Sequence, residues 1–83
     1  MTDSIIGKSF YVSLNQLDPA DQARVNKFIP RFMENPANPG TSLERVTDAK
    51  DPKIWSARIS RSLRAILHKD GGRAFLLFVG QHD

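Results

Sequence analysis

The 83-residue sequence contains no cysteine, only two histidines and no long apolar run. Without cysteine there are no disulfides and no thiolate metal ligands, which fits a reducing cytoplasm. A membrane-spanning helix needs roughly 20 consecutive apolar residues, so we predict no membrane contact. The first ten residues, MTDSIIGKSF, also lack the basic and long apolar segments of a secretion signal. These absences predict a cytoplasmic protein.

The two histidines do not form a metal-binding pattern. His68 and His82 are 14 residues apart and have no companion ligand at a spacing typical of metal sites. The Gly71-Gly72 pair lacks the strand–loop–helix context of a phosphate-binding loop, and no serine lies in a nucleophile-elbow motif. We therefore predict no metal, no cofactor and no nucleophilic triad.

Length and composition indicate one folded domain. A content of 40% hydrophobic and 25% charged residues is ordinary for globular proteins and argues against disorder. Because 83 residues are too few to divide, we expect a single domain over residues 1–83.

Positive charge is concentrated in the second half of the sequence. The net charge is +3, and eight of the twelve lysines and arginines lie in residues 45–73, against three acids there. Such a segment would attract a phosphate backbone. The same charges would suit a solvated surface, so composition leaves both interpretations open.

The first half of the sequence predicts a strand followed by two helices. Residues 4–7 are short and apolar, as in a strand. Apolar residues between positions 10 and 17 fit both strand alternation and helical spacing, and Ser9 as an N-cap favours a helix. Asp18-Pro19 is a stronger signal, because a capping residue precedes proline at the first helical position.

The helix that begins after Asp18 carries an apolar stripe at helical spacing. Its members are Val25, Phe28, Ile29, Phe32 and Met33. Pro30 lies inside the stripe and predicts a kink or a division of the helix. Residues 35–40, rich in proline and asparagine, end it. A polar loop follows over residues 41–53, with a short extended piece at 43–46.

Residues 54–68, IWSARISRSLRAILH, predict a hairpin whose two faces differ. Pairing Ala57 with Ala65 keeps arginine out of the apolar face, which a slip of one residue would not. The apolar face then consists of Trp55, Ala57, Ile59, Leu63, Ala65 and Leu67. The other face consists of Ser56, Arg58, Arg64, Ile66 and His68. Guanidinium groups on a rigid sheet are suited to bind phosphate. In the alternative interpretation, the arginines form ion pairs with the acids of residues 44–51 and only make this face soluble in water.

A turn at residues 69–72 and a last strand at residues 74–79 complete the predicted elements. The continuous apolar run AFLLFV predicts a strand covered on both sides, where a shallow cleft is an alternative for one of the two covers. The length of the turn decides which face of the sheet receives alternate residues of the last strand. A three-residue turn places them on the face that carries Arg58 and Arg64, and a two-residue turn places them on the apolar face. These residues are Ala74, Leu76, Phe78, Gly80 and His82. The sequence does not decide between these turns.

The predicted order of a strand, a helical hairpin and three antiparallel strands coincides with specific motifs. The segments IWSARI (residues 54–59) and RSLRAI (residues 61–66) resemble the W-S-x-R-I/V … x-R-x-I/V hairpin of the RelE/ParE toxin superfamily. Leu43-Glu44 resembles its upstream L-E element, and residues 35–40 lie where its helical hairpin ends. The resemblance spans almost the whole chain. It implies an α+β RelE-like fold with an N-terminal strand, a helical hairpin that includes residues 9–17, and a three-stranded antiparallel meander completing one sheet.

The resemblance also implies a function. Family members that are toxins of type II toxin–antitoxin systems cleave mRNA on the ribosome, without metal, by attack of a ribose 2′-hydroxyl on the adjacent phosphate. An antitoxin protein neutralises them. Arg64 resembles the arginine that contributes to cleavage, Glu44 the general base, and His82 the C-terminal general acid of the YoeB-like branch. Asp83 stands where the family often has an aromatic residue. We expect nucleic-acid contacts at Arg58, Arg61, Lys53, Lys50 and His68.

A narrower resemblance supplies an alternative. The segments AKDP (residues 49–52), ILHK (residues 66–69) and VGQHD (residues 79–83) are similar to the RelE-like domain of some bacterial superfamily-1 DNA helicases. A non-catalytic binding module with this fold is therefore the second hypothesis. A ParE-like inhibitor of DNA gyrase is the third.

Overall fold

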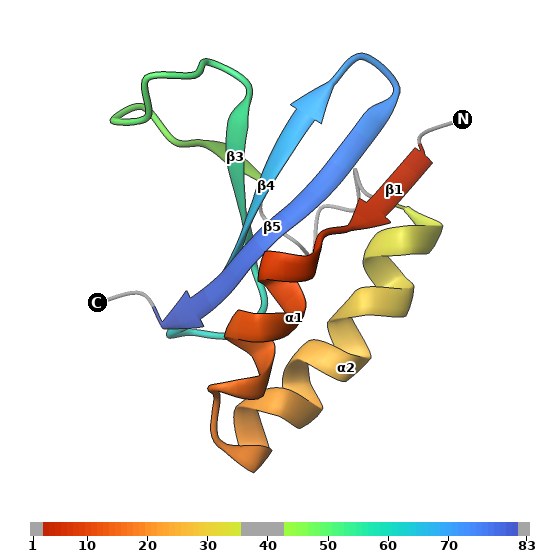
Figure 1. The fold of residues 1–83 in the computed structure, drawn as a ribbon, viewed down its shortest axis with the longest axis vertical. Coiled ribbons are helices and arrows are strands. Elements are labelled where there is room, and N and C mark those ends of the chain that lie inside the picture. The colour runs from red at the N-terminus through yellow and green to blue at the C-terminus, as the bar shows by residue number, and fades with distance from the viewer. Residues whose placement is uncertain (1–2, 36–42, 82–83) are drawn as a thin grey trace.

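A five-stranded sheet with two helices packed on one face makes up the structure, a computed structural model that describes residues 3–35 and 43–81 (Figure 1). Its elements are β1 (Asp3–Ile6), α1 (Lys8–Asn15), α2 (Pro19–Glu34), β2 (Glu44–Arg45), β3 (Ile54–Arg58), β4 (Leu63–Asp70) and β5 (Arg73–Gln81). The strand order is β1-β5-β4-β3-β2, with β1 parallel to β5 and the other pairs antiparallel. The predicted α+β order of a strand, a helical hairpin and a meander is confirmed.

The hairpin of β3 and β4 has the predicted register. Ala57 pairs with Ala65, and Arg58 pairs with Arg64. Four residues of the predicted apolar face are fully buried beneath the helices: Ala57, Leu63, Ala65 and Leu67. They form one core with α1 and α2, which contribute Phe10, Leu14, Val25, Phe28 and Phe32. The opposite face of the hairpin is not covered by either helix, and we call it the open face.

The last strand combines a two-residue turn with a bulge. Asp70 pairs with Arg73 across Gly71-Gly72, and Gly71 adopts a φ of 59°, which favours glycine. Leu76 lies opposite Leu67, but Phe78 lies opposite Ile66, so an extra residue is inserted at Leu77. This bulge moves the following residues to the other face.

The consequence is that β5 changes faces along its length. Ala74 and Leu76 point into the core, whereas Phe78 and Gly80 share the open face with Arg64. Only one side of AFLLFV is covered by the core, because Phe75 is 39% exposed and Phe78 is 50% exposed. On the other side Phe78 lines a cleft, which agrees with the alternative that the sequence left open.

The second helix follows its sequence signals closely. Asp18 is the N-cap, and its Oδ1 accepts a hydrogen bond of 2.8 Å from the Asp21 N–H. Pro30 lies inside α2, which continues to Glu34, so the predicted division of the helix does not occur. Met33, the last member of the predicted stripe, is 39% exposed, whereas Phe32 next to it is fully buried.

Beyond the end of β1, the first helix and its N-cap form hydrogen bonds with the backbone of β5. Helix α1 starts at Lys8 with Gly7 as N-cap, so the prediction that Ser9 caps it is wrong. Ser9 Oγ instead donates to the Leu77 carbonyl. Gly7 N–H donates to the Leu76 carbonyl at 2.9 Å, and Val79 N–H donates to Ser13 Oγ at 3.0 Å. These bonds satisfy backbone groups of β5 that a longer β1 would otherwise pair with. Within residues 3–35 and 43–81, no helix has the length and apolar character to cross a membrane.

Candidate functional site on the open face of the sheet

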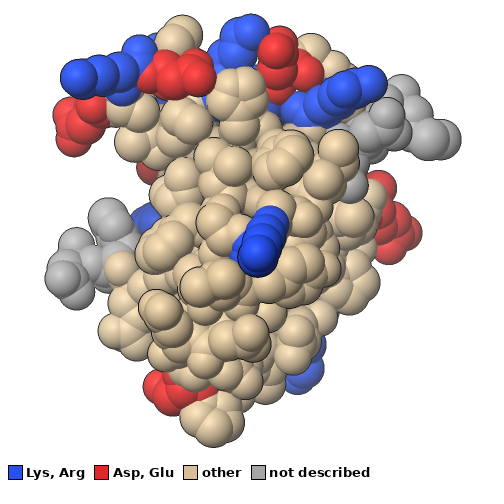
Figure 2. All heavy atoms as spheres, in the orientation of Figure 1, with Lys and Arg blue, Asp and Glu red and all other residues tan. Residues whose placement is uncertain are grey.

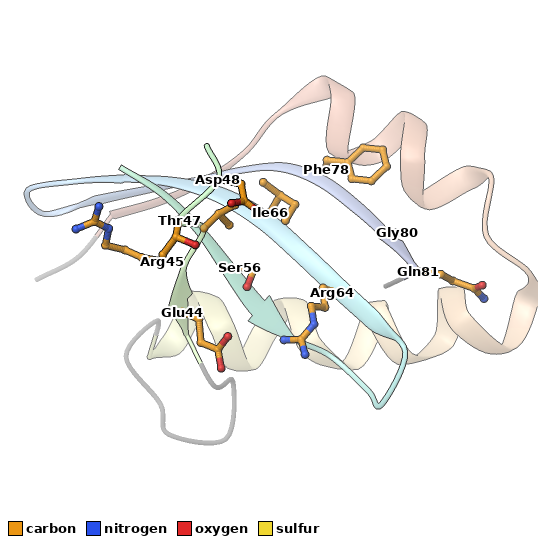
Figure 3. Close-up of a pocket in the computed structure, with 11 residues that line it drawn as sticks. Glu44, Arg45, Thr47, Asp48, Ser56, Arg64, Ile66, Phe78, Gly80 and Gln81 are labelled. Atoms are coloured by element: carbon orange, nitrogen blue, oxygen red, sulfur yellow. The ribbon is translucent and has the colours of Figure 1, made fainter. Parts of the chain in front are cut away.

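A cleft of about 330 Å³ lies on the open face (Figure 3). Strands β2 to β5 and the loop after β2 form it. The lining residues are Glu44, Arg45, Val46, Thr47, Asp48, Ser56, Arg64, Ile66, Phe78, Gly80 and Gln81. Two of the three predicted catalytic residues, Arg64 and Glu44, therefore share one cavity.

Strand register explains why these side chains meet. Glu44 pairs with Ser56, Ser56 with Ile66, and Ile66 with Phe78, so one row of residues crosses four strands. The next row consists of Arg58, Arg64 and Gly80. Paired residues of neighbouring strands point to the same side of a sheet. The short strand β2, which carries Glu44, adds an acid to a face that the hairpin alone would make basic.

Arg64 contributes to the cleft a buried hydrogen-bond donor that has no acceptor among the described residues. It is partly buried, and its Nε is buried without a hydrogen-bond partner among the described residues. Its strand neighbour Arg58 carries the same charge. A buried donor without an acceptor costs free energy, and a guanidinium binds carboxylate or phosphate in a bidentate manner. The cleft is thus suited to an anion that accepts hydrogen bonds from Arg64.

Glu44 lies across the cleft from Arg64 without pairing to it. The carboxylate is exposed, and it makes no ion pair with a residue of the described part of the chain. Figure 3 shows Glu44 and Arg64 on either side of Ser56. Ser56 is 8% exposed and short, so it leaves open space between the acid and the guanidinium. A phosphate could occupy that space and contact both neighbours.

The basic residues predicted to contact nucleic acid fall into two groups. Arg58, Arg61 and Lys50 are exposed and have no ion pair among the residues described. Lys53, by contrast, pairs with Asp70, with Nζ 3.0 Å from Oδ1. Figure 2 shows blue and red side chains next to one another at the end of the molecule that carries the β4–β5 turn. Part of the positive charge is therefore compensated there.

His68 anchors the loop that leads from the cleft to β3. Its Nε2 lies 3.2 Å from Asp51 Oδ2, and the Lys53 N–H donates to Asp51 Oδ1 at 2.9 Å. The Lys53 N–H is the main cause that lowers the pKa of Asp51 below its usual value of 3.8, and His68 adds to it. His68 and Lys53 therefore pair with acids, as the alternative interpretation of the charged surface expects. Their role in nucleic-acid contact stays a prediction.

His82, the predicted general acid, lies outside the described residues. Within the described ranges, no group of three or more His, Cys, Asp or Glu side chains is arranged to hold a metal ion.

Phe78, Gly80 and Gln81 are among the cleft residues that the sequence did not assign to the site, and the sequence left open on which face Phe78 and Gly80 lie. The bulge at Leu77 brings Phe78 and Gly80 there, and AFLLFV contains no local signal for a bulge. Ile66 was assigned to the arginine face by alternation, and its place in the cleft agrees with that.

Comparison with solved structures identifies the fold. No protein-family model and no curated protein matches the sequence. The RelBE2 toxin–antitoxin complex from Mycobacterium tuberculosis matches with a TM-score of 0.74 and 17% identity, over 98% of both chains. YafQ from Escherichia coli matches with 0.73 and 9%, over 98% of this chain and 93% of that one. A YoeB/ParE toxin from Agrobacterium tumefaciens matches with 0.68 and 16%, over 99% and 100%.

These similarities cover nearly the full length of each chain. At such identities they establish the fold, and the chain has the RelE-like toxin fold. The predicted resemblance to the RelE/ParE superfamily is therefore confirmed at the level of the fold. The solved structures that match this chain are toxins of the RelE, YoeB, YafQ and ParE types.

Proposed function

We propose that the protein is a toxin of a type II toxin–antitoxin system that cleaves mRNA on the ribosome. The observation that carries this proposal is the partly buried Arg64, whose Nε has no hydrogen-bond partner among the described residues, in a cleft that also contains Glu44. An antitoxin protein is the proposed partner, and two structural neighbours are toxin–antitoxin complexes, RelBE2 and DinJ-YafQ.

The proposed reaction transfers a phosphoryl group within the RNA. Glu44 takes the proton of the ribose 2′-hydroxyl, whose oxygen attacks the adjacent phosphorus. Arg64 donates hydrogen bonds to the phosphate oxygens, on which charge develops. The bond to the 5′ oxygen of the next nucleotide breaks, and His82 gives a proton to that oxygen. The products are a 2′,3′-cyclic phosphate and a 5′-hydroxyl end.

The surrounding cations support substrate binding in this proposal. Arg58 lies beside Arg64 on the open face and would hold the backbone on one side of the scissile phosphate. Arg61 and Lys50 are exposed and would extend the contact along the strand. Each phosphate contact releases counterions, so binding is expected to weaken as salt is raised.

The test is cleavage of a reporter mRNA in a translation extract, mapped by primer extension. We expect the wild-type protein to cleave and R64A to lose about 100- to 1,000-fold in rate, because one donor to a developing oxyanion is removed. R73A is the matched control, since Arg73 is an exposed arginine of β5 outside the cleft. Intact message with the wild-type protein, or full cleavage by R64A, would contradict the proposal.

A non-catalytic binding module is the second candidate. The exposure of Glu44 favours it, because no described hydrogen bond holds that carboxylate in a reactive position. This candidate predicts salt-sensitive RNA binding with the message left intact. A DNA supercoiling assay with gyrase separates both candidates from a ParE-like inhibitor, which alone would block the enzyme.

A further inference from the structure

An exposed phenylalanine lies next to the anion site of the cleft. Phe78 is 50% exposed on β5 and lies opposite Ile66. Arg64 is two residues from Ile66 on β4, so Phe78 and Arg64 are diagonal neighbours. Such neighbours are separated by about 7–8 Å between their backbones, within reach of long and aromatic side chains.

The local structure leaves room for the Phe78 ring on the side of Arg64. Gly80 is the strand partner of Arg64, and a Cβ atom at Gly80 would lie 2.7 Å from Cε1 of Phe78. The ring therefore occupies space that any other residue at position 80 would take. On its other side a shallow hollow along α1, lined by Lys8, Val12 and Gln16 among others, also reaches Phe78. The ring separates two open spaces.

We propose that Phe78 stacks against a nucleobase of the RNA whose phosphate is bound by Arg64. This inference rests on the proposed function and extends it to the recognition of the substrate. A nucleotide presents an anion and a flat aromatic base separated by one ribose. These match a guanidinium whose Nε has no partner in the described part of the chain and an exposed ring on the adjacent strand. Single-stranded RNA is commonly held by aromatic side chains on which unstacked bases lie.

Stacking on Phe78 should differ from the phosphate contact at Arg64 in its dependence on RNA sequence and on salt concentration. Every base has a π-face, so stacking on Phe78 tolerates any sequence, unlike hydrogen bonds to base edges. Stacking also releases no counterions, whereas the phosphate contact at Arg64 does. Loss of the ring should therefore lower affinity without changing its salt dependence, and loss of Arg64 should change both.

The experiment measures binding of the full chain to a labelled 2′-O-methyl RNA oligonucleotide, which cannot be cleaved because its 2′-oxygen is blocked. Fluorescence anisotropy at several salt concentrations gives Kd and its salt slope. We expect F78A to raise Kd about tenfold at every salt concentration, and F78Y to restore wild-type affinity. R64A should raise Kd and also flatten the slope.

Matched variants separate stacking from general loss of apolar surface. F75A is the control, because Phe75 is 39% exposed on the same strand and the open face but does not line the cleft. It should leave Kd within about twofold of wild type. G80A, which forces the Phe78 ring to move, should weaken binding while keeping the ring. An oligonucleotide with abasic residues should bind wild type and F78A equally. Thermal unfolding shows that each variant is folded.

The outcomes distinguish this inference from the proposed function. If F78A binds RNA as tightly as wild type while R64A binds weakly, the stacking contact is overturned and phosphate binding stands. Phe78 would then be left as an apolar contact for a protein partner. If the wild-type chain binds no RNA at low salt, the stacking inference is overturned, and the proposed function is decided separately by cleavage in the translation extract. A loss with F78A that is equalled by F75A also overturns the specific role of Phe78.

Discussion

Arg64 combines two features that lower the stability of the protein and that a bound anion would relieve. The hairpin register places it opposite Arg58, and its Nε is buried without a partner among the described residues. Two like charges directly opposite each other on a sheet are destabilising, and a buried donor without an acceptor adds a desolvation cost. Such features are retained at functional sites, where a ligand compensates for them.

We predict that R64M stabilises the isolated protein while removing the proposed anion contact. Methionine keeps an unbranched side chain but removes the buried donor, so the free energy of unfolding should rise by about 1 kcal/mol. Urea unfolding measures the change. R58M relieves the same charge repulsion at an exposed position and should shift stability by less than about 0.5 kcal/mol. A larger gain for R58M than for R64M would show that burial of Arg64 is not the cause.

Among the elements, α1 and β5 depend on one another through side-chain hydrogen bonds. Ser13 is 5% exposed; its Oγ donates to the Phe10 carbonyl and accepts from the Val79 N–H. Val79 directly follows Phe78, so this bond fixes the part of β5 that the bulge turns toward the cleft. The helix thus helps to hold the candidate site although it lies on the other face of the sheet.

We predict that S13A destabilises the protein by about 1–3 kcal/mol, because the buried Val79 N–H loses its acceptor. S9A is the control: Ser9 Oγ bonds the Leu77 carbonyl at an exposed position, where water can replace it, and its cost should stay below about 1 kcal/mol. Chemical denaturation of both variants provides the comparison. Equal costs for the two serines would contradict the assignment of Val79 N–H as buried.

At the scale of the whole molecule, residues 3–35 and 43–81 form one sheet with one core, and the cleft is on the face away from that core. Both helices and β3, β4 and β5 contribute to a single cluster of buried side chains. The radius of gyration is 11.8 Å, which is the size expected for one compact domain of this length, about 12 Å. We therefore propose that residues 1–83 fold as one unit.

This proposal predicts a single cooperative unfolding transition. Trp55 is the sole tryptophan and packs against the core from β3, so its fluorescence reports on the sheet. Far-ultraviolet circular dichroism reports mainly on the two helices. The two signals should have the same midpoint in urea, as expected for a two-state domain. Separate midpoints would mean that the helices and the sheet unfold independently.

Local signals predicted several elements because they depend on neighbouring residues. The N-cap at Asp18 needs only a side-chain acceptor before Pro19, and the structure has both. The pairing of Ala57 with Ala65 follows from the alternation of apolar and charged residues, and it is confirmed. The cap of the first helix was wrong, because Ser9 bonds to Leu77, a residue 68 positions away.

The sequence by itself determined the hairpin register, the helix that starts at Asp18 and the face on which Arg64 lies. Alternation and capping are local, so one strand or one turn is enough to specify them. Only the tertiary structure decided that Glu44 and Phe78 share a cleft with Arg64, while His68 and Lys53 pair with acids. The shared cleft depends on the pairing of β2 with β3 and on the bulge at Leu77. Both arise from contacts between residues distant in the chain, which no local pattern encodes.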